Sequence, residues 1–225
     1  MANIQWEYIF DFELALGSIP FILKGLPYTM GIALISTFFG LILGLILATM
    51  RIINIPILDW IARTYISFMR GTPTLVLLFL LYFGLPFIGI QLDAISAAVI
   101  GFSINSAAYI AEIVRSSISS VAIGQWEAAY ALGLNWAFVM RKIILPQAFR
   151  TAIPPLSNVV LDIIKGTSLT AMITVPDMFQ NAKIVGGREF DYMTMYILVA
   201  VIYWIICSLF SMLQNYLEER TSTYV

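Results

Sequence analysis

Histidine is absent from the 225-residue sequence, and Cys207 is its one cysteine. This composition excludes a disulfide within the chain, a zinc site built from cysteine and histidine, and a catalytic triad or general base that uses histidine. The sequence also lacks the glycine loop ending in Lys-Ser or Lys-Thr with which many proteins hold ATP. We therefore expect a protein that is not an enzyme and that holds no metal and no cofactor of its own.

Charge is also scarce, because Lys and Arg number 12, Asp and Glu number 13, and together they make up 11% of the chain. Soluble domains carry about 25% charged and about 45–50% apolar residues, whereas 60% of this chain is apolar. A chain of this length can bury only part of so much apolar surface in its own core, so the remainder must face membrane lipid. The net charge of −1 argues against a nucleic-acid binder.

Stretches without charge predict where the chain crosses the membrane, since a spanning helix needs about 20 apolar residues. Four such stretches are long enough or nearly so: residues 25–50, 71–92, 94–111 and 192–217. A fifth, from about residue 136 to 166, is apolar but contains Pro154-Pro155 and the charged residues Arg141, Lys142, Arg150, Asp162 and Lys165. Charges and prolines at membrane depth require neighbouring helices or a cavity. We expect one all-α domain over residues 1–225, a polytopic membrane helical bundle of about five transmembrane helices.

Basic residues are distributed unevenly between the predicted loops, and this asymmetry predicts the orientation. Six lie on one side: Arg51, Arg63, Arg115, Arg141, Lys142 and Arg220. Three lie on the other: Lys24, Lys183 and Arg188. Since basic residues favour the cytoplasm, the N-terminus is predicted outside and the C-terminus in the cytoplasm. Residues 1–24 mix aromatic and acidic side chains, which is typical of a segment at the outer membrane interface.

The first predicted span carries small residues at a regular spacing. Gly40, Gly44 and Ala48 follow one another at intervals of four, so they lie on one helix face. Such a ridge lets another helix approach closely. The spacing fits ordinary packing within the chain or, less often, a seam between two subunits.

A short segment, residues 124–135, joins the third and fourth spans on the predicted cytoplasmic side. It reads GQWEAAYALG from residue 124 to 133, which favours a short helix ended by Gly133. Composition alone is typical of an interfacial helix that only connects two spans. The spacing indicates more, because Glu-Ala-Ala is followed by three residues, Gly133, nine residues and Ile143-Ile144-Leu145-Pro146. This pattern resembles the signature loop of the membrane subunits of bacterial ABC importers, in which the loop docks as a coupling helix into a cytoplasmic ATPase.

Other segments resemble the polar amino-acid uptake branch of the same family, over roughly residues 25–217. They are RGTP at 70–73, AAYIAEI at 107–113, LPQA at 145–148, PPLSN at 154–158 and KGTSL at 165–169. The whole pattern is most similar to cystine permeases. One departure is Gly166, where many amino-acid permeases have an aspartate.

The resemblance implies a multi-pass permease subunit in the bacterial cell membrane that imports a polar amino acid, with L-cystine as the leading substrate. Its partners are then cytoplasmic ABC ATPase subunits that use ATP and magnesium, an extracellular substrate-binding protein, membrane lipid and a second permease subunit, in a homodimer rather than a heterodimer. ATPase coupling is assigned by the resemblance to Glu127, Ala128, Ala129 and Gly133. The alternative is a secondary transporter or channel that needs no ATPase, for which an inverted repeat is expected and none is detected.

Polar residues within the spans are the candidates for the substrate site. Asn158, Asp162 and Lys165 are spaced by four and three residues, so they share one helix face. Asp162 can accept the ammonium group of an amino acid, while Thr72 and Ser106 can donate hydrogen bonds to its carboxylate. An equally weighted alternative is that Asp162 and Lys165 form only a structural ion pair.

Two further expectations concern the third and fourth spans. Glu112 and Arg115 are three residues apart on the third span and are predicted to pair. On the fourth, helix breaks at Pro154-Pro155 and at Gly166 are expected to free backbone N–H groups for a charged substrate.

Overall fold

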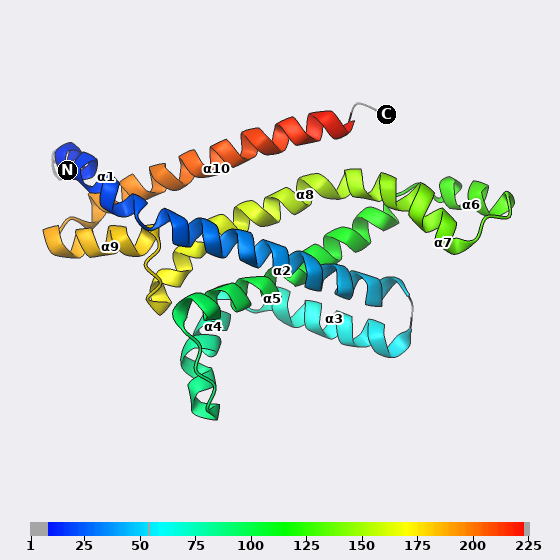
Figure 1. The fold of residues 1–225 in the computed structure, drawn as a ribbon, viewed down its shortest axis with the longest axis horizontal. Helices are drawn as coiled ribbons and strands as arrows, with labels where there is room; N and C mark the ends of the chain where they lie inside the picture. The colour runs from blue at the N-terminus through cyan, green and yellow to red at the C-terminus, as the bar shows by residue number, and fades with distance from the viewer. Residues whose placement is uncertain (1–8, 54, 223–225) are drawn as a thin grey trace, which may run out of the picture. The chain divides into compact units, whose positions relative to one another are not determined.

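The computed structural model describes residues 9–53 and 55–222, and within these residues the chain is helical and forms no strand (Figure 1). The α-helices are α1 (Phe12–Leu23), α2 (Leu26–Ile52), α3 (Pro56–Gly71), α4 (Thr74–Phe79), α5 (Ala94–Ser119), α6 (Ile123–Ala131), α7 (Trp136–Val139), α8 (Leu145–Gly166), α9 (Met178–Glu189) and α10 (Tyr192–Ser222). Residues Leu80–Gly84 and Met140–Ile144 form π-helical turns, and Leu85–Ile88 and Thr167–Ile173 form 3-10 turns. The predicted all-α class is confirmed.

Four helical stretches of the described chain are long and apolar enough to cross a membrane: Leu26–Ile52, Ala94–Ser119, Trp136–Ile173 and Tyr192–Tyr216. The segments Pro56–Gly71 and Thr74–Ile88 pass the same test together, as one broken span. The count of four or five agrees with the prediction of about five spans.

The second span differs from the sequence prediction, which placed a single helix over residues 71–92. α4 ends at Phe79, and the chain continues through irregular helical turns to Ile88 and a left-handed turn at Gly89. α3 supplies the missing length, with Ala62, Ile66 and Met69 buried along one face. This amphipathic helix escaped prediction because it also carries charged residues beside its buried face, which interrupt an apolar run without interrupting a helix.

A second expectation, a break in the fourth span at Pro154-Pro155, is wrong. Both prolines lie inside one continuous α-helix. The helix ends at Gly166 as expected, but Gly166 keeps right-handed helical angles and the chain continues as a 3-10 turn. Thr167 donates from Oγ1 to the carbonyl of Ile164 at 2.7 Å. No new α-helix begins at Gly166, so the N–H groups that a break was expected to free for a substrate are not those of an α-helix N-terminus.

The described chain divides into two compact units. The first comprises Met1–Ser36, Thr74–Gly101 and Leu161–Ser211, and the second comprises Thr37–Pro73, Phe102–Val160 and Met212–Val225.

In the first unit, α1 packs on α9 and α10. The buried cluster includes Ala15 and Ile22 of α1, Met178 and Val185 of α9, and Met195 of α10. The hydroxyl of Thr194 accepts the backbone N–H of Asp11 at 2.9 Å, and the amide of Asn181 donates to the carbonyl of Phe21 at 3.1 Å. α1 therefore packs as part of this unit. Residues 1–8 of the predicted interfacial segment 1–24 lie outside the described residues, and its position at the membrane surface stays a prediction.

In the second unit, the small residues of α2 allow α5 to approach closely. A Cβ atom on Gly44 would lie 2.6 Å from Cγ2 of Ile110, and one on Gly40 would overlap the Ser106 hydroxyl. Ala48 is also buried. The ridge thus serves packing within the chain.

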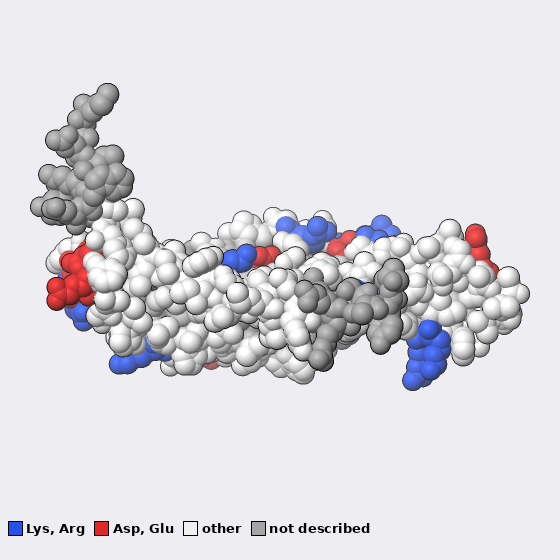
Figure 2. All heavy atoms as spheres, turned by 90° about the horizontal axis from the view of Figure 1, so that it is seen from above, with Lys and Arg blue, Asp and Glu red and all other residues white. Residues whose placement is uncertain are grey.

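Figure 2 shows one face of the molecule, on which charged side chains form small groups separated by wide uncharged surface. Large apolar side chains such as Leu34, Phe38 and Trp204 are exposed on α2 and α10. Such a surface is suited to lipid or to other membrane helices rather than to water.

Candidate functional site

α8 carries a row of exposed polar side chains along its whole length, which we name the α8 polar face. Its members are Gln147, Thr151, Asn158, Asp162 and Lys165. They follow at intervals of three, four or seven residues, so they lie on one side of the helix. A membrane helix cannot present such a row to hydrocarbon without a cost of roughly 2.5–3.5 kcal/mol for each central charge. The α8 polar face must therefore contact water or another protein surface.

Asp162 and Lys165 are brought into direct contact. Oδ1 of Asp162 lies 2.8 Å from Nζ of Lys165, and the two side chains remain 72% and 58% exposed, respectively. An exposed pair of opposite charges can exchange its mutual contact for the two charges of a ligand. The predicted ion pair is present, and its exposure leaves both groups accessible.

The other three predicted substrate residues lie in the second unit, and the structure does not join them into one site. Asn158 is exposed on α8. Thr72 is half-buried just beyond the end of α3 and donates to the carbonyl of Phe68 at 2.8 Å. Ser106 is buried within α5 and donates to the carbonyl of Ser103 at 3.2 Å. Each hydroxyl therefore gives its proton to its own helix and keeps only acceptor capacity.

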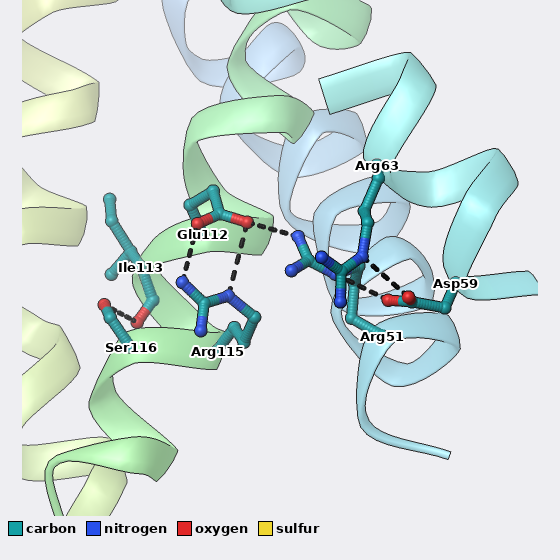
Figure 3. Close-up of polar contacts among 7 residues, drawn as sticks. All are labelled: Arg51, Asp59, Arg63, Glu112, Ile113, Arg115 and Ser116. Atoms are coloured by element: carbon teal, nitrogen blue, oxygen red, sulfur yellow. Dashed lines mark hydrogen bonds and ion pairs between the residues drawn. The ribbon is translucent and has the colours of Figure 1, made fainter. Parts of the chain in front are cut away.

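An ion-pair network that the sequence did not predict joins α2, α3 and α5 in the second unit (Figure 3). Arg51 bridges two carboxylates: its Nε lies 2.9 Å from Oδ1 of Asp59, and its Nη1 lies 2.6 Å from Oε1 of Glu112. Arg63 also contacts Asp59, and Arg115 also contacts Glu112.

This network confirms the predicted Glu112–Arg115 pair and extends it. Arg51 is only 11% exposed, so its pairs are less screened by solvent than ordinary surface pairs. Arg51 lies 61 residues from Glu112 in the chain, and no local spacing in the sequence could indicate that contact. The network ties the end of α2 and the start of α3 to α5.

The segment after α5 folds as the predicted short helix, α6, ended by a Schellman turn at Gly133. The N–H of Gly133 donates to the carbonyl of Tyr130 at 2.9 Å, and that of Leu134 donates to Ala129 at 3.2 Å. Gly133 has φ of +73°, the left-handed conformation that glycine adopts without strain. The glycine predicted to end the helix therefore turns the chain toward α7.

One face of α6 packs against neighbouring helical segments, and the other face is exposed. Ala129 is buried and Trp126 half-buried in a cluster with Val139 and Ile144. Glu127 and Ala128 are exposed, and the apolar residues Ile123 and Leu132 are 71% and 78% exposed. An exposed face that mixes apolar and charged side chains is suited to a protein partner.

A buried acid, Asp177, lies where α9 begins. Its Oδ1 accepts the N–H of Gln180 at 2.8 Å, and its Oδ2 accepts the hydroxyl of Tyr203 at 3.2 Å. The residue is fully buried, and this burial raises the pKa of the Asp177 carboxyl to about 6. In sequence Asp177 is an ordinary helix-capping residue, so its burial could not be predicted.

Among the described residues, no group of three or more cysteines, aspartates or glutamates could hold a metal ion. The exposed polar side chains of α8 and the exposed face of α6 are the surfaces suited to contacts with polar groups and with a protein partner.

Comparison with known proteins identifies the family of this chain. The family described as "Binding-protein-dependent transport system inner membrane component" matches residues 40–223. The chain belongs to this family. It is therefore a multi-pass membrane permease and a non-enzymatic subunit of an ABC importer, which works with ATPase subunits, a substrate-binding protein and a second permease subunit.

Individual permeases of the family are similar over nearly the whole chain. The "Probable amino-acid ABC transporter permease protein YckA" of Bacillus subtilis (strain 168) is 59% identical over 223 residues, 99% of each chain. The "L-cystine transport system permease protein TcyB" of the same organism is 44% identical, over 92% of this chain and 88% of its own. A solved structure, "Crystal structure of an amino acid ABC transporter with histidines", has a TM-score of 0.89 at 35% identity and covers 93% of this chain and 98% of its own.

Proposed function

We propose that this permease imports polar amino acids and that L-cystine is its substrate. The exposed Asp162–Lys165 pair carries this proposal. A free amino acid has an ammonium and a carboxylate on one carbon, and a neighbouring acid and base can bind both by charge-assisted hydrogen bonds. The substrate would break the Asp162–Lys165 ion pair, and its ammonium and carboxylate would then pair with Asp162 and Lys165, respectively.

The proposed substrate also fits a two-fold arrangement. L-cystine consists of two amino-acid groups joined by a disulfide, and a homodimer presents two copies of the Asp162–Lys165 pair about its symmetry axis. Relatives support the substrate class, since YckA is named for amino acids and TcyB for L-cystine. We further assign Asn158 and Thr72 to the polar lining of the pathway, Thr72 as an acceptor, whereas Ser106 is buried against α2 and serves helix packing.

We assign α6 as the docking element for the ATPase. Glu127 and Ala128 belong to its exposed face, Ala129 anchors it to the permease, and Gly133 turns the chain toward α7. ATP and magnesium are bound by that partner.

The structure offers a route from α6 to the α8 polar face. The cluster that holds Ala129 continues into the start of α8 through Ile144 and Ala148. Gln147 of the α8 polar face also donates to the side chain of Gln125 in α6 at 3.4 Å. Movement of α6 by the ATPase would displace α8 and shift the permease between inward-open and outward-open states. The orientation follows the basic residues, with the N-terminus outside and α6 in the cytoplasm.

Competition for uptake tests the substrate. Cells that contain the permease with its ATPase and binding protein take up labelled L-cystine in the presence of excess unlabelled L-cystine, L-cysteine, L-glutamine, L-arginine or L-methionine. We expect L-cystine to compete most strongly and L-cysteine, which has one amino-acid group, to compete weakly. Stronger competition by a different amino acid would reassign the substrate, and uptake of label that none of the added amino acids reduces would contradict the proposed class.

A further inference from the structure

An apolar groove with a volume of about 480 Å³ lies between α2, α5 and α8 in the second unit. Its lining includes Leu41 and Leu45 of α2, Ile118 of α5, and Leu145, Phe149 and Leu156 of α8. A second cavity of about 260 Å³ shares Leu41, Phe149 and Leu156 with it and extends to Val160. Apolar surface is therefore continuous along α8 from Leu145 to Val160, about 22 Å of helix. This length exceeds the roughly 15 Å of hydrocarbon in one leaflet of a bilayer.

The groove lies on the side of α8 opposite the α8 polar face. Leu145, Phe149 and Leu156 each precede or follow a polar-face residue by two positions, which is about 200° around a helix. If the α8 polar face contacts water or a second permease subunit, the groove points away from that surface. Its apolar lining suits hydrocarbon.

One cationic side chain lines this groove. Arg141, in the π-helical turn before α8, is exposed, and Lys142 follows it. Neither side chain forms an ion pair with any residue that the structure describes. A basic residue at one end of an apolar groove between membrane helices complements an anionic headgroup whose acyl chain occupies the groove.

We propose that this groove is a binding site for an anionic phospholipid, with one acyl chain along Phe149 and Leu156 and the headgroup phosphate on Arg141. The site is separate from the amino-acid pathway and its occupant is not transported. Bound lipid would fill the space between α8 and its two neighbours and so hold α8 against α2 and α5.

Binding to the purified permease tests the proposal, with dioleoyl phosphatidylglycerol as the anionic probe and dioleoyl phosphatidylcholine as its zwitterionic match. Native mass spectrometry measures the apparent affinity for each. We expect wild-type permease to prefer phosphatidylglycerol about fivefold, the effect of one basic residue near a lipid phosphate. Arg141→Gln should abolish the preference without weakening phosphatidylcholine binding. Lys24→Gln, a basic residue of the other unit, is the matched control and should keep the preference.

A second pair of variants tests the acyl-chain position. Ala152→Phe fills the groove from a lining residue and should weaken both lipids. Phe149→Ala removes an exposed side chain, is expected to leave folding intact, and should also weaken both. Equal affinity of wild-type permease for the two lipids overturns the proposal, as does an unchanged preference in Arg141→Gln. Disulfide cross-linking between two copies of a Phe149→Cys, Cys207→Ser variant would place a second permease in the groove and also overturn it.

Discussion

Asp162 and Lys165 are the residues through which this permease is expected to recognise its substrate. Asp162→Asn keeps the shape of the side chain but removes the charge that accepts an ammonium. Loss of a charge-assisted hydrogen bond costs about 1.5–3 kcal/mol. The L-cystine concentration for half-maximal uptake should therefore rise roughly 10- to 100-fold, while assembly with the ATPase and basal ATP hydrolysis change little.

A purely structural ion pair gives a different pattern. Removal of one partner would then leave the other charge uncompensated and lower thermal stability and expression, and replacement of both would restore them. The comparison needs Asp162→Asn, Lys165→Met and the double variant, each measured for uptake and thermal stability. Restored uptake in the double variant would show that no substrate charge is bound there.

Asp177 predicts the direction in which the stability of the folded protein changes with pH. Its pKa is raised by burial from 3.8 to about 6, so the folded protein favours the neutral carboxyl, and the corresponding stability is present at low pH and lost as pH rises through about 6. That pKa difference corresponds to at most roughly 3 kcal/mol. Asp177→Asn keeps the acceptor for the Gln180 N–H, so its thermal stability relative to wild type should increase between pH 5 and pH 8.

Asp93 is the matched control for that measurement. It accepts the N–H groups of Ile95 and Ser96 at the start of α5, both at 3.0 Å. The hydrogen bond from the Ser96 hydroxyl lowers the pKa of Asp93, so its contribution to stability is lost only as pH falls below its usual range. Asp93→Asn should leave the trend between pH 5 and pH 8 unchanged. A flat difference between wild type and Asp177→Asn over that range contradicts the assignment of a raised pKa.

At the scale of single residues, the sequence predicted what local spacing determines. Asp162 and Lys165 are one helical turn apart, and Glu112 and Arg115 are likewise, so both pairs could be predicted. The contacts of Arg51 with Glu112 and of Tyr203 with Asp177 depend on which helices pack together, and no spacing encodes them.

Among the helices, α6 makes the most specific prediction. Gly133→Val places a β-branched residue at φ of +73°, where only glycine is free of strain, and should distort the turn that orients α6. Substrate-stimulated ATP hydrolysis by the assembled complex should be lost, although the permease still reaches the membrane. Gly124→Ala is the matched control, because Gly124 has open space around it and should tolerate a methyl group. Normal stimulation in an assembled Gly133→Val complex contradicts the coupling role of α6.

The sequence predicted helix boundaries correctly where a helix coincides with a long uncharged apolar stretch. α2, α5 and α10 lie where uncharged stretches predicted them. α3 was missed because helical amphipathicity tolerates charges that a search for uncharged runs rejects. α8 was expected to break at Pro154-Pro155 but continues through both residues, and proline inside a membrane helix is compatible with a helical path.

The topology of the whole molecule is tested by labelling engineered cysteines in a Cys207→Ser background. Phe87, 92% exposed between α4 and α5, is predicted outside, and Leu132, at the end of α6, is predicted in the cytoplasm. An impermeant thiol reagent should label Phe87→Cys on intact cells and Leu132→Cys only after the cells are opened. The reverse pattern would invert the orientation, and labelling of both on intact cells would contradict a cytoplasmic α6.

ATP-driven import is the central claim, and reconstituted transport tests it most directly. Permease, ATPase and binding protein are placed in liposomes, and the accumulation of labelled L-cystine is measured with and without ATP at the ATPase. We predict accumulation only with ATP and none in a matched Gly133→Val complex. Equal uptake with and without ATP would contradict the account and indicate a channel or secondary transporter.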